Sequence, residues 1–265
     1  MKFLIILSLL CSTVNAYSAQ KIIRLATTTS TENSGLLHYL LPFFKKESGY
    51  TVHVIAVGTG KALRMGQEGD VDVLLVHALE AEQEFVHKGY GVKRYAVMYN
   101  DFVIIGSAND PAGIQNSPSV QTAFNNIQAN KSLFISRGDD SGTHKKEKKI
   151  WAAANISPKG NWYREIGQGM GKAIQMANEL EAYTLTDRGT WLSYKDKVDL
   201  NVLYQGDKSL FNPYGIIAVN PKRYPDININ GANALINWII SKQGQILIGQ
   251  YKKEGQVLFS PSAEQ

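Results

Sequence analysis

An apolar run gives way at once to a row of hydroxyl side chains in residues 22–31, which read IIRLATTTST. Residues 22–26 predict a short strand, because a buried strand reads as a brief, mainly apolar run bounded by turn signals. The hydroxyls of residues 27–31 follow, and leucines and a phenylalanine then recur at helical spacing over residues 36–44. The segment therefore predicts a strand, a polar loop and a helix in succession.

The same order of elements continues along the chain. Strands are predicted at residues 51–57 and 71–76, and helices at 59–68 and 79–88. Such a β-α-β-α-β order implies a largely parallel sheet covered by helices. Further strands are predicted at 102–106, 133–136, 182–185 and 216–219, and further helices at 142–154, 172–180, 232–240 and 244–251. The fold class is therefore α/β with two α/β units, and we place the segments that cross between them near residues 97–101 and 203–212.

The first residues, 1–16, predict a cleaved signal peptide. Lys2 supplies a positive start, residues 3–10 form an apolar core too short to span a bilayer, and the run VNA at 14–16 offers a cleavage site after Ala16. Cleavage at Ala19 is the alternative. Cys11, the single cysteine, lies inside this segment, so the mature chain is expected to have no disulfide. We expect an exported protein of the periplasm.

The charge of the chain is modest and scattered. Lys and Arg total 28 against 23 Asp and Glu, which makes a formal net charge of +5. The basic pairs at 145–146 and 148–149 fall on a helical pattern, where a charge run is usually a solvated face. The sequence has no basic stripe with interleaved aromatic residues, so nucleic acid is not an expected partner.

Three polar loops share one design, in which a predicted strand ends, hydroxyls or glycines follow, and a helix begins. A helix N-terminus offers unpaired backbone N–H groups and a partial positive charge, which makes it a natural anion site. In open α/β sheets, ligands also sit at the carboxyl ends of strands. The first loop places Thr28, Thr29 and Ser30 there as hydroxyl donors. The alternative is plain helix capping, for which one or two hydroxyls would be enough.

The other two loops differ in how specific they are. Gly58-Thr59-Gly60-Lys61 makes Thr59 a candidate donor, although a plain turn and cap explains this loop equally well. The third loop, residues 136–144, reads SRGDDSGTH. Its Arg137 offers a planar fork of donors suited to an oxyanion, and Ser141, Gly142 and Thr143 add hydroxyls and an accessible N–H at the start of a helix. The alternative is an ion pair between Arg137 and Asp139 that only rigidifies a turn.

Some polar residues nearby are given lesser roles. Thr184 again ends a strand before a helix and is kept as a candidate donor from the far wall, while Gly167-Gln168-Gly169-Met170-Gly171 is interpreted as a connector. His144 and Glu147 share a helix face, but a metal site needs more ligands than these, so we expect a solvated or capping role for both. No metal and no cofactor is predicted.

The chain, almost end to end, resembles the TupA family, the tungstate-binding components of ABC importers. The resemblance rests on Thr27-Thr28-Thr29-Ser30 after the first strand and on residues 137–144, followed by Lys146-Glu147. It implies a type II periplasmic-binding-protein fold, in which two α/β lobes are joined by two crossing segments with the ligand cleft between them. Lobe one would comprise residues 17–98 and 208–265, and lobe two residues 99–207.

The same resemblance implies the ligand, the donors and the partner. Thr28, Thr29 and Ser30, with Thr59 less securely, would donate from lobe one. Arg137, Ser141, Gly142 and Thr143 would donate from lobe two. The ligand would be tungstate, with molybdate as a close relative, and the lobes would close on it by a hinge motion. The loaded protein, which we expect to be a monomer, would dock on an ABC permease in the inner membrane.

The third loop also resembles that of phosphate-binding proteins of the same fold, which keeps a phosphate importer as the alternative function. Hydrogenphosphate carries a proton that a carboxylate can accept, whereas a carboxylate facing fully deprotonated tungstate repels it. Asp139 decides between the two: pointing inward it favours phosphate, and paired with Arg137 or capping the next helix it leaves tungstate favoured. The opening run TTTS favours tungstate.

Two other classes of protein are weighed and set aside. A secreted hydrolase could use Ser141 with Asp140 and His144, but the chain lacks the G-x-S-x-G nucleophile elbow, and His144 should point along its helix and away from the loop. We therefore predict that the chain is not an enzyme. A transcriptional effector domain can share this fold, but the predicted signal peptide and the lack of a DNA-binding module argue against it.

Overall fold

The computed structural model describes residues 21–263, so the predicted signal peptide lies outside the described residues. The strands are β1 (Ile22–Thr28), β2 (Thr51–Val57), β3 (Val73–Val76), β4 (Gly91–Ser107), β5 (Phe134–Ser136), β6 (Tyr163–Glu165), β7 (Thr184–Asp187), β8 (Leu200–Tyr204), β9 (Phe211–Val219), β10 (Lys252–Lys253), β11 (Gln256–Val257) and β12 (Ser260–Pro261). The helices are α1 (Thr29–Asn33), α2 (Leu36–Ser48), α3 (Thr59–Glu68), α4 (Leu79–His87), α5 (Val120–Ala129), α6 (Gly142–Ala153), α7 (Met170–Glu179), α8 (Arg188–Tyr194), α9 (Ile229–Ile240) and α10 (Lys242–Gln250), with the 3-10 turn η1 (Lys208–Leu210). No helix within residues 21–263 is long and apolar enough to cross a membrane.

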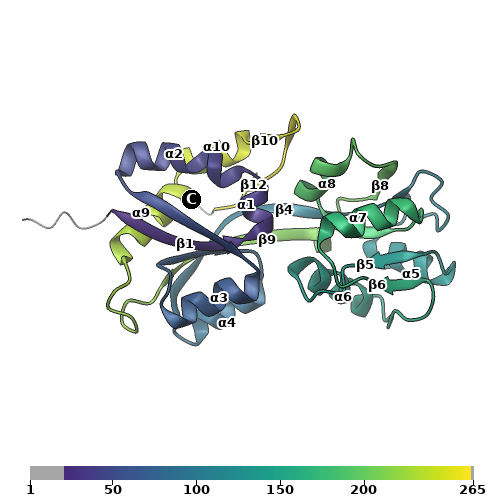
Figure 1. Ribbon diagram of the computed structural model, residues 1–265, viewed down its shortest axis with the longest axis horizontal. Coiled ribbons are helices and arrows are strands. Elements are labelled where there is room, and N and C mark those ends of the chain that lie inside the picture. Colours follow the sequence, from purple (N-terminus) through teal and green to yellow (C-terminus); the bar gives the residue numbers. More distant parts are fainter. Residues whose placement is uncertain (1–20, 264–265) are drawn as a thin grey trace, which may run out of the picture.

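The chain forms two bodies, each with its own strands and covering helices, as Figure 1 shows. The first body is built on the sheet path β12-β4-β9-β3-β1-β2. β1 pairs in parallel with both β2 and β3, as the predicted element order requires. β9 and β4 join antiparallel, which differs from the largely parallel sheet we expected. The reason is that β9 returns from the second body after β8 and η1 and enters the sheet between β4 and β3 in the opposite direction, without the helical crossover that parallel neighbours need.

β4 is 17 residues long and extends through both bodies (Figure 1). Its first part pairs with β9, and its last residues pair with β7 and β8. The strand predicted at 102–106 is therefore only the second half of β4, and the crossing predicted at 97–101 is its middle. Register shifts against β9 between Gly91 and Arg94 and between Ala96 and Met98 interrupt the alternation that would reveal the first half.

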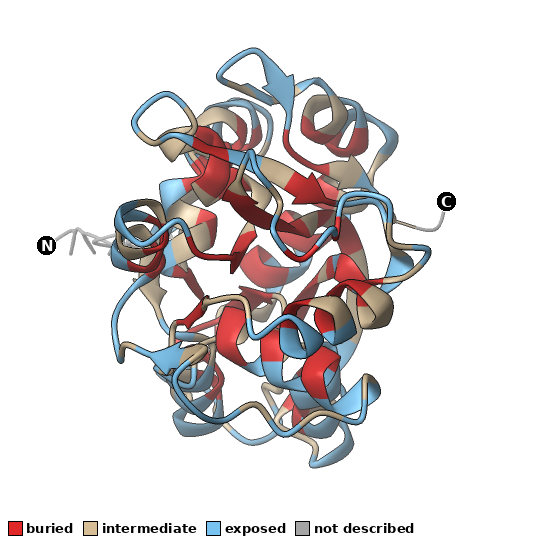
Figure 2. Ribbon diagram, turned by 90° about the vertical axis from the view of Figure 1, so that its right-hand side faces the viewer, coloured by how far each residue is buried: buried red, intermediate tan, exposed pale blue. Residues whose placement is uncertain are grey.

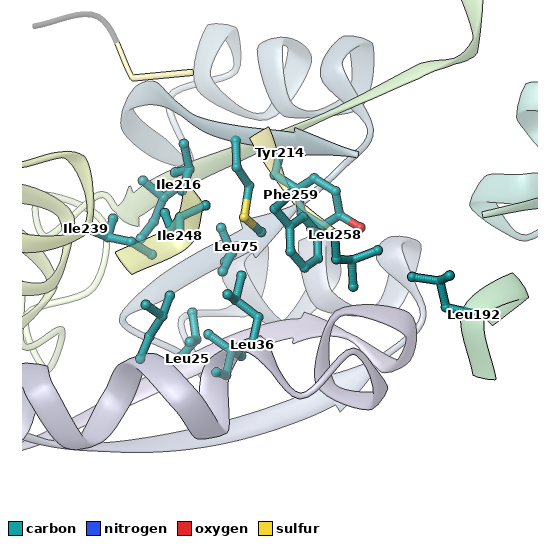
Figure 3. Close-up of a cluster of buried hydrophobic side chains, with 14 of the residues drawn as sticks. Leu25, Leu36, Leu75, Leu192, Tyr214, Ile216, Ile239, Ile248, Leu258 and Phe259 are labelled. Atoms are coloured by element: carbon teal, nitrogen blue, oxygen red, sulfur yellow. The ribbon is translucent and has the colours of Figure 1, made fainter. Parts of the chain in front are cut away.

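Apolar side chains are buried on both faces of the first sheet and inside the second body. Leu25, Leu36 and Ile239 belong to the cluster between the sheet and the layer of α2, α9 and α10 (Figure 3). On the opposite face Phe85 lies in the cluster under α3 and α4, and Trp151 lies in the core of the second body. Figure 2 shows buried residues on the inward faces of the helices and exposed residues on their outward faces. Burial of this apolar surface is the main favourable term in folding.

The sheet brings several loops to one edge. Because β1, β2 and β3 are parallel, their carboxyl ends meet there. The register pairs Thr28 with Val57 and Thr27 with Leu75. The hydroxyl loop after β1, the Gly58-Thr59 loop after β2 and the first residues after β3 are therefore neighbours. Of these three loops, sequence reasoning considered only the first two.

Candidate functional site

Thr28 ends β1 and caps the helix that follows. It is the N-cap of α1, and its Oγ1 accepts a hydrogen bond from the backbone N–H of Thr31 at 3.2 Å. The same oxygen lies 2.6 Å from Thr31 Oγ1 and 3.0 Å from Ser30 Oγ. Thr28 and Thr31 are buried, Ser30 is half-buried and Thr29 is exposed. Of the predicted first-loop donors, Thr29 and Ser30 therefore face outward, while Thr28 lies beneath them.

His77 is the site residue that sequence reasoning missed. It directly follows β3, and its Nε2 lies 3.1 Å from Thr28 Oγ1 and 3.4 Å from Ser30 Oγ. Its Nδ1 lies 3.1 Å from Oδ1 of Asn212 on β9, and its ring stacks on Tyr214 with centroids 4.7 Å apart. The sequence signal that could have identified His77 is its position directly after a predicted strand, because β3 ends at the same sheet edge as β1.

The surroundings of His77 keep its ring neutral. Burial lowers the pKa of the imidazole, and the hydrogen bond to Asn212 and the charge of Asp187 oppose this only in part. Desolvation always disfavours the charged form of a histidine. His77 therefore presents one N–H and one lone pair, and not two donors.

The loop after β5 is closed by its own side chains. Arg137 Nη2 and Nε donate to Oδ2 of Asp139 at 2.5 and 3.1 Å, and the Ser141 N–H donates to the other carboxylate oxygen at 3.2 Å. Gly138 and Asp140 adopt φ values of +61° and +55°. That conformation suits the glycine, and Asp tolerates it better than most residues do. Asp139 is thus paired with Arg137, the arrangement that leaves a fully deprotonated anion favoured.

The Asp139 carboxylate is held in its ionised form. Burial raises its pKa, but the hydrogen bonds from Ser141 and Arg137 outweigh burial and lower the pKa below its usual value. Both carboxylate oxygens already accept hydrogen bonds from within the loop. Asp139 is therefore poorly placed to accept a proton from a ligand.

His144 and Glu147 are buried, so of the two roles expected for them, solvated or capping, the solvated one is wrong. His144 is 5% exposed and Glu147 is 2% exposed. His144 Nδ1 accepts the Asp140 N–H at 3.0 Å, and its Nε2 lies 3.3 Å from a carboxylate oxygen of Glu165. His144 also faces back toward the loop, contrary to the expected direction away from it. Both residues lie on the side of α6 that faces the interior of the second body, so both side chains are buried.

Glu147 is an acid buried behind the loop. It accepts hydrogen bonds from Tyr163 Oη at 2.8 Å and from Trp151 Nε1 at 3.1 Å. Burial raises its pKa to about 7, and these two hydrogen bonds oppose the rise only in part. The support of this loop therefore includes a carboxyl group that titrates near neutral pH.

The loops from the two bodies meet. A Cβ placed on Gly142, the first residue of α6, would lie 3.4 Å from Cε1 of His77. Farther along the same helix, Lys149 Nζ lies 2.7 Å from Glu80 on α4. The start of α6 is thus held against the residues that surround Thr28 and Ser30. The remaining loop residues Arg137, Ser141 and Thr143 are within a few residues of this contact.

The other predicted site residues lie at different depths. Thr59 is the first residue of α3 and is half-buried, and a Cβ added to the neighbouring Gly58 or Gly60 would meet open space. Thr143 is buried in the first turn of α6. Thr184 is buried, and its hydroxyl donates to the Ile135 carbonyl at 2.8 Å. The hydroxyl hydrogen of Thr184 is therefore already committed within the second body.

Ser141 and His144 hydrogen-bond to the backbone of their own loop and helix. The Ser141 hydroxyl does not pair with the His144 ring, as a nucleophile and its base would. Ser141 Oγ accepts the backbone N–H of His144 at 3.3 Å, which caps α6. The His144 imidazole meets the Asp140 N–H and Glu165 instead. Among residues 21–263, no group of three or more His, Cys, Asp or Glu side chains is placed to hold a metal ion.

Known proteins resemble this chain over most of its length. A family model described as a PBP superfamily domain matches residues 15–243. The tungstate-binding protein TupA of Peptoclostridium acidaminophilum is 51% identical over 94% of this chain and 89% of its own, and TupA of Campylobacter jejuni is 42% identical over 87% of each. The solved tungstate-binding protein TupA of Desulfovibrio alaskensis is 47% identical, covers 92% of this chain and 99% of its own, and superposes with a TM-score of 0.87. The chain therefore belongs to the periplasmic-binding-protein superfamily and, within it, to the TupA family.

Proposed function

We propose that this chain captures a tetrahedral oxyanion, tungstate, and delivers it to an ABC import permease. The observation that carries the proposal is the closeness of Gly142 to His77, since a Cβ placed on Gly142 would lie 3.4 Å from the ring, which brings the start of α6 near the Thr28–Ser30 loop. Two sets of hydroxyls and helix N–H groups thereby converge on one place. The names of the TupA relatives, which are tungstate-binding proteins, support the choice of ligand.

The proposed donors come from three loops. In α6 the first intrahelical bond runs from Lys145 N to Ser141 O, so the N–H groups of Gly142 and Thr143 precede it and are available to an anion. Arg137, whose Nε and Nη2 donate to Asp139, adds its charge and its Nη1 beside them, and Ser30 adds a hydroxyl from the other body. The complete set that we propose is Thr29, Ser30, Thr59, Arg137, Ser141, Gly142 and Thr143. Thr28 and Thr184 stay behind these donors because their hydroxyls are engaged within the protein.

Tungstate is preferred over phosphate because of Asp139. The carboxylate is ionised and receives hydrogen bonds from Arg137 and Ser141. A protonated anion needs an acceptor in its site, whereas fully deprotonated tungstate needs only donors. The pairing of Asp139 therefore supports a site for a dianion without a proton, which fits tungstate and the closely similar molybdate.

The setting of this function is proposed from the relatives and from the predicted signal peptide. We infer a periplasmic shuttle that acts as a monomer and docks on a permease of the inner membrane. We also infer that the chain catalyses no reaction, because Ser141 caps α6 and is not paired with the His144 ring. Turnover of an ester by the mature chain that Ser141→Ala abolishes would contradict this.

The test is the thermal unfolding midpoint of the mature chain, residues 17–265, after exhaustive dialysis. Tungstate, molybdate, sulfate and phosphate are added in separate samples. A ligand at about a thousand times its dissociation constant stabilises the folded state by about 4 kcal/mol, which raises the midpoint measurably. We expect a large rise with tungstate and none with phosphate. A rise with phosphate alone would replace this proposal with the phosphate alternative.

A further inference from the structure

A buried polar network lies beneath the first-loop donors and connects four separate parts of the chain. Thr28 and Thr31 come from the end of β1 and from α1, and His77 follows β3. Asn100 comes from β4, and Asn212 from β9. Apart from His77, which is half-buried, each of these residues is at most 5% exposed. Buried polar groups of this kind need every donor and acceptor matched.

The two asparagines determine which nitrogen of His77 carries its hydrogen. Asn212 Nδ2 donates to Asn100 Oδ1 at 2.8 Å, so the carbonyl oxygen of Asn212 faces the other way, toward His77 Nδ1 at 3.1 Å. The carbonyl oxygen of an amide can only accept, so Nδ1 must hold the hydrogen. Nε2 of the neutral ring is then a lone pair that faces Thr28.

This tautomer determines the state of the Thr28 hydroxyl. A hydroxyl has one hydrogen to donate and two lone pairs that can accept. Thr28 gives its hydrogen to His77 Nε2 at 3.1 Å and accepts from Thr31 N at 3.2 Å and Thr31 Oγ1 at 2.6 Å. Its hydrogen-bonding capacity is then complete.

Ser30 is left as the hydroxyl with a free hydrogen. Its Oγ lies 3.0 Å from Thr28 Oγ1, but Thr28 has no lone pair left to receive it. The contact to His77 Nε2 is longer, at 3.4 Å, and that lone pair already receives the Thr28 hydrogen at 3.1 Å. The hydrogen of Ser30 can therefore turn toward an external acceptor, as an oxyanion would be.

We infer that His77 is a positioning residue that, as the Nδ1–H tautomer held by Asn212 and Asn100, engages the Thr28 hydroxyl and leaves Ser30 as the first-loop hydroxyl donor to the anion. This inference rests on the proposed function for the nature of the ligand, but the tautomer itself does not depend on any ligand. The two residues that hold the ring lie on β4 and β9, the strands that extend between the bodies. The Gly142 end of α6 lies close to the same ring, where a Cβ placed on Gly142 would be 3.4 Å from Cε1.

The first experiment reads the tautomer directly. The side-chain nitrogens of the five histidines are observed by ¹⁵N NMR in the mature chain without ligand, and His77 is assigned by the signal lost in His77→Gln. We expect His77 to be neutral with hydrogen on Nδ1. Hydrogen on Nε2, or on both nitrogens at pH 7.5, would overturn the inference whether or not the protein binds tungstate.

The second experiment measures tungstate affinity by calorimetry in two variants. In His77→Leu the ring nitrogen that Thr28 and Ser30 both face is gone, so the two hydroxyls lose the group that orients them, and we expect affinity to fall about tenfold, the usual worth of a hydrogen bond. In His77→Gln an amide oxygen can take the place of Nε2 and should restore most of the affinity. His87→Leu, an exposed histidine at the end of α4, is the matched control.

The outcomes separate this inference from the proposed function. Wild-type affinity in a folded His77→Leu variant would overturn the positioning role, as would an equal loss in both His77 variants. Should His77→Leu not fold, the comparison of His77→Gln with wild type and the NMR measurement still decide. A wild-type chain that binds none of the four oxyanions would remove the proposed function, while the tautomer measurement would stand by itself.

Discussion

The two loops that meet at the site are held together in opposite ways. The loop after β1 depends on partners that are far away in the chain, since Thr28 meets His77, 49 residues on, and His77 meets Asn212, 135 residues further. The loop after β5 closes on itself, with hydrogen bonds that span four residues or fewer between Arg137 and His144. The first loop takes its shape only when the sheet is assembled. The second is held mainly by its own residues, with Gln168 N donating to Arg137 O as a more distant support.

The loops also differ in charge. Arg137 and Asp139 form an ion pair in the second loop, and His144 lies beside Glu165. The first loop and its supports exchange hydrogen bonds between neutral groups alone. Charge-assisted hydrogen bonds are about twice as strong as neutral ones. We therefore expect the second loop to supply most of the attraction for an anion, and the first to supply the placement of its hydroxyls.

The histidines behind the loops show the same contrast. His77 has a hydrogen on Nδ1 because Asn212 presents an oxygen there, and His144 has a lone pair on Nδ1 because the Asp140 N–H points at it. The hydrogen of His144 is then on Nε2, facing Glu165. The partner of one nitrogen sets the role of the other in each case.

The largest effect is expected from reversing the charge of the second loop. Arg137→Glu removes the donor fork and places a second carboxylate beside Asp139, so tungstate affinity should fall by roughly a thousandfold or more. Calorimetry measures the affinity, and circular dichroism checks the fold. Arg164→Glu on β6, which changes an exposed arginine of the same body, is the control and should bind normally. Undiminished affinity in a folded Arg137→Glu protein would remove Arg137 from the site.

The next effect concerns the acid that supports the second loop. Burial raises the pKa of Glu147 to about 7 from an ordinary value near 4.5, so the folded state holds this proton more tightly than the unfolded state does. The stability that this gives is complete below pH 4.5 and is lost as pH rises through 7, by at most about 3 kcal/mol. Urea unfolding at pH 5 and pH 8 should show a steeper loss in wild type than in Glu147→Gln. Equal losses in the two proteins would contradict the raised pKa.

A smaller pair of effects should separate the two hydroxyls of the first loop. Thr28→Val leaves the His77 lone pair and the Thr31 N–H without a partner, so unfolding in the absence of ligand should become easier by about 1–3 kcal/mol. Ser30→Ala removes a donor to the ligand and should change that stability little while lowering tungstate affinity about tenfold. Urea unfolding and calorimetry measure the two quantities. The reverse pattern would show that Thr28 contacts the anion.

The smallest effect is expected at the rim. Lys149 and Glu80 join α6 to α4, and both side chains are largely exposed. Exposed ion pairs are weak and are screened by salt. Lys149→Gln should therefore lower tungstate affinity only about twofold at low ionic strength and have no effect in about 0.5 M salt. The neighbouring exposed Lys148→Gln is the control. A loss that persists in high salt would mean that this pair contributes more than a surface contact.

Much of the local structure could be predicted from the sequence. The helix predicted at residues 59–68 is α3, the strand predicted at 51–57 is β2, and the predicted start of a helix at Gly142 is the start of α6. These elements depend on periodicity and on capping residues, which are properties of neighbouring residues. The first half of β4 could not be predicted in this way, because register shifts against β9 interrupt its alternation.

By itself, the sequence determined an α/β protein with hydroxyl-rich loops at strand ends and a polar loop around Arg137, for which an ion pair with Asp139 was one of two interpretations. Only the tertiary structure decided that His144 and Glu147 are buried, and that His77 lies under Thr28 and close to Gly142. The physical reason is distance along the chain. Hydrogen bonds within a few residues follow from local backbone geometry, whereas those across 49 or 135 residues depend on strand order and register, which form only when the sheet does.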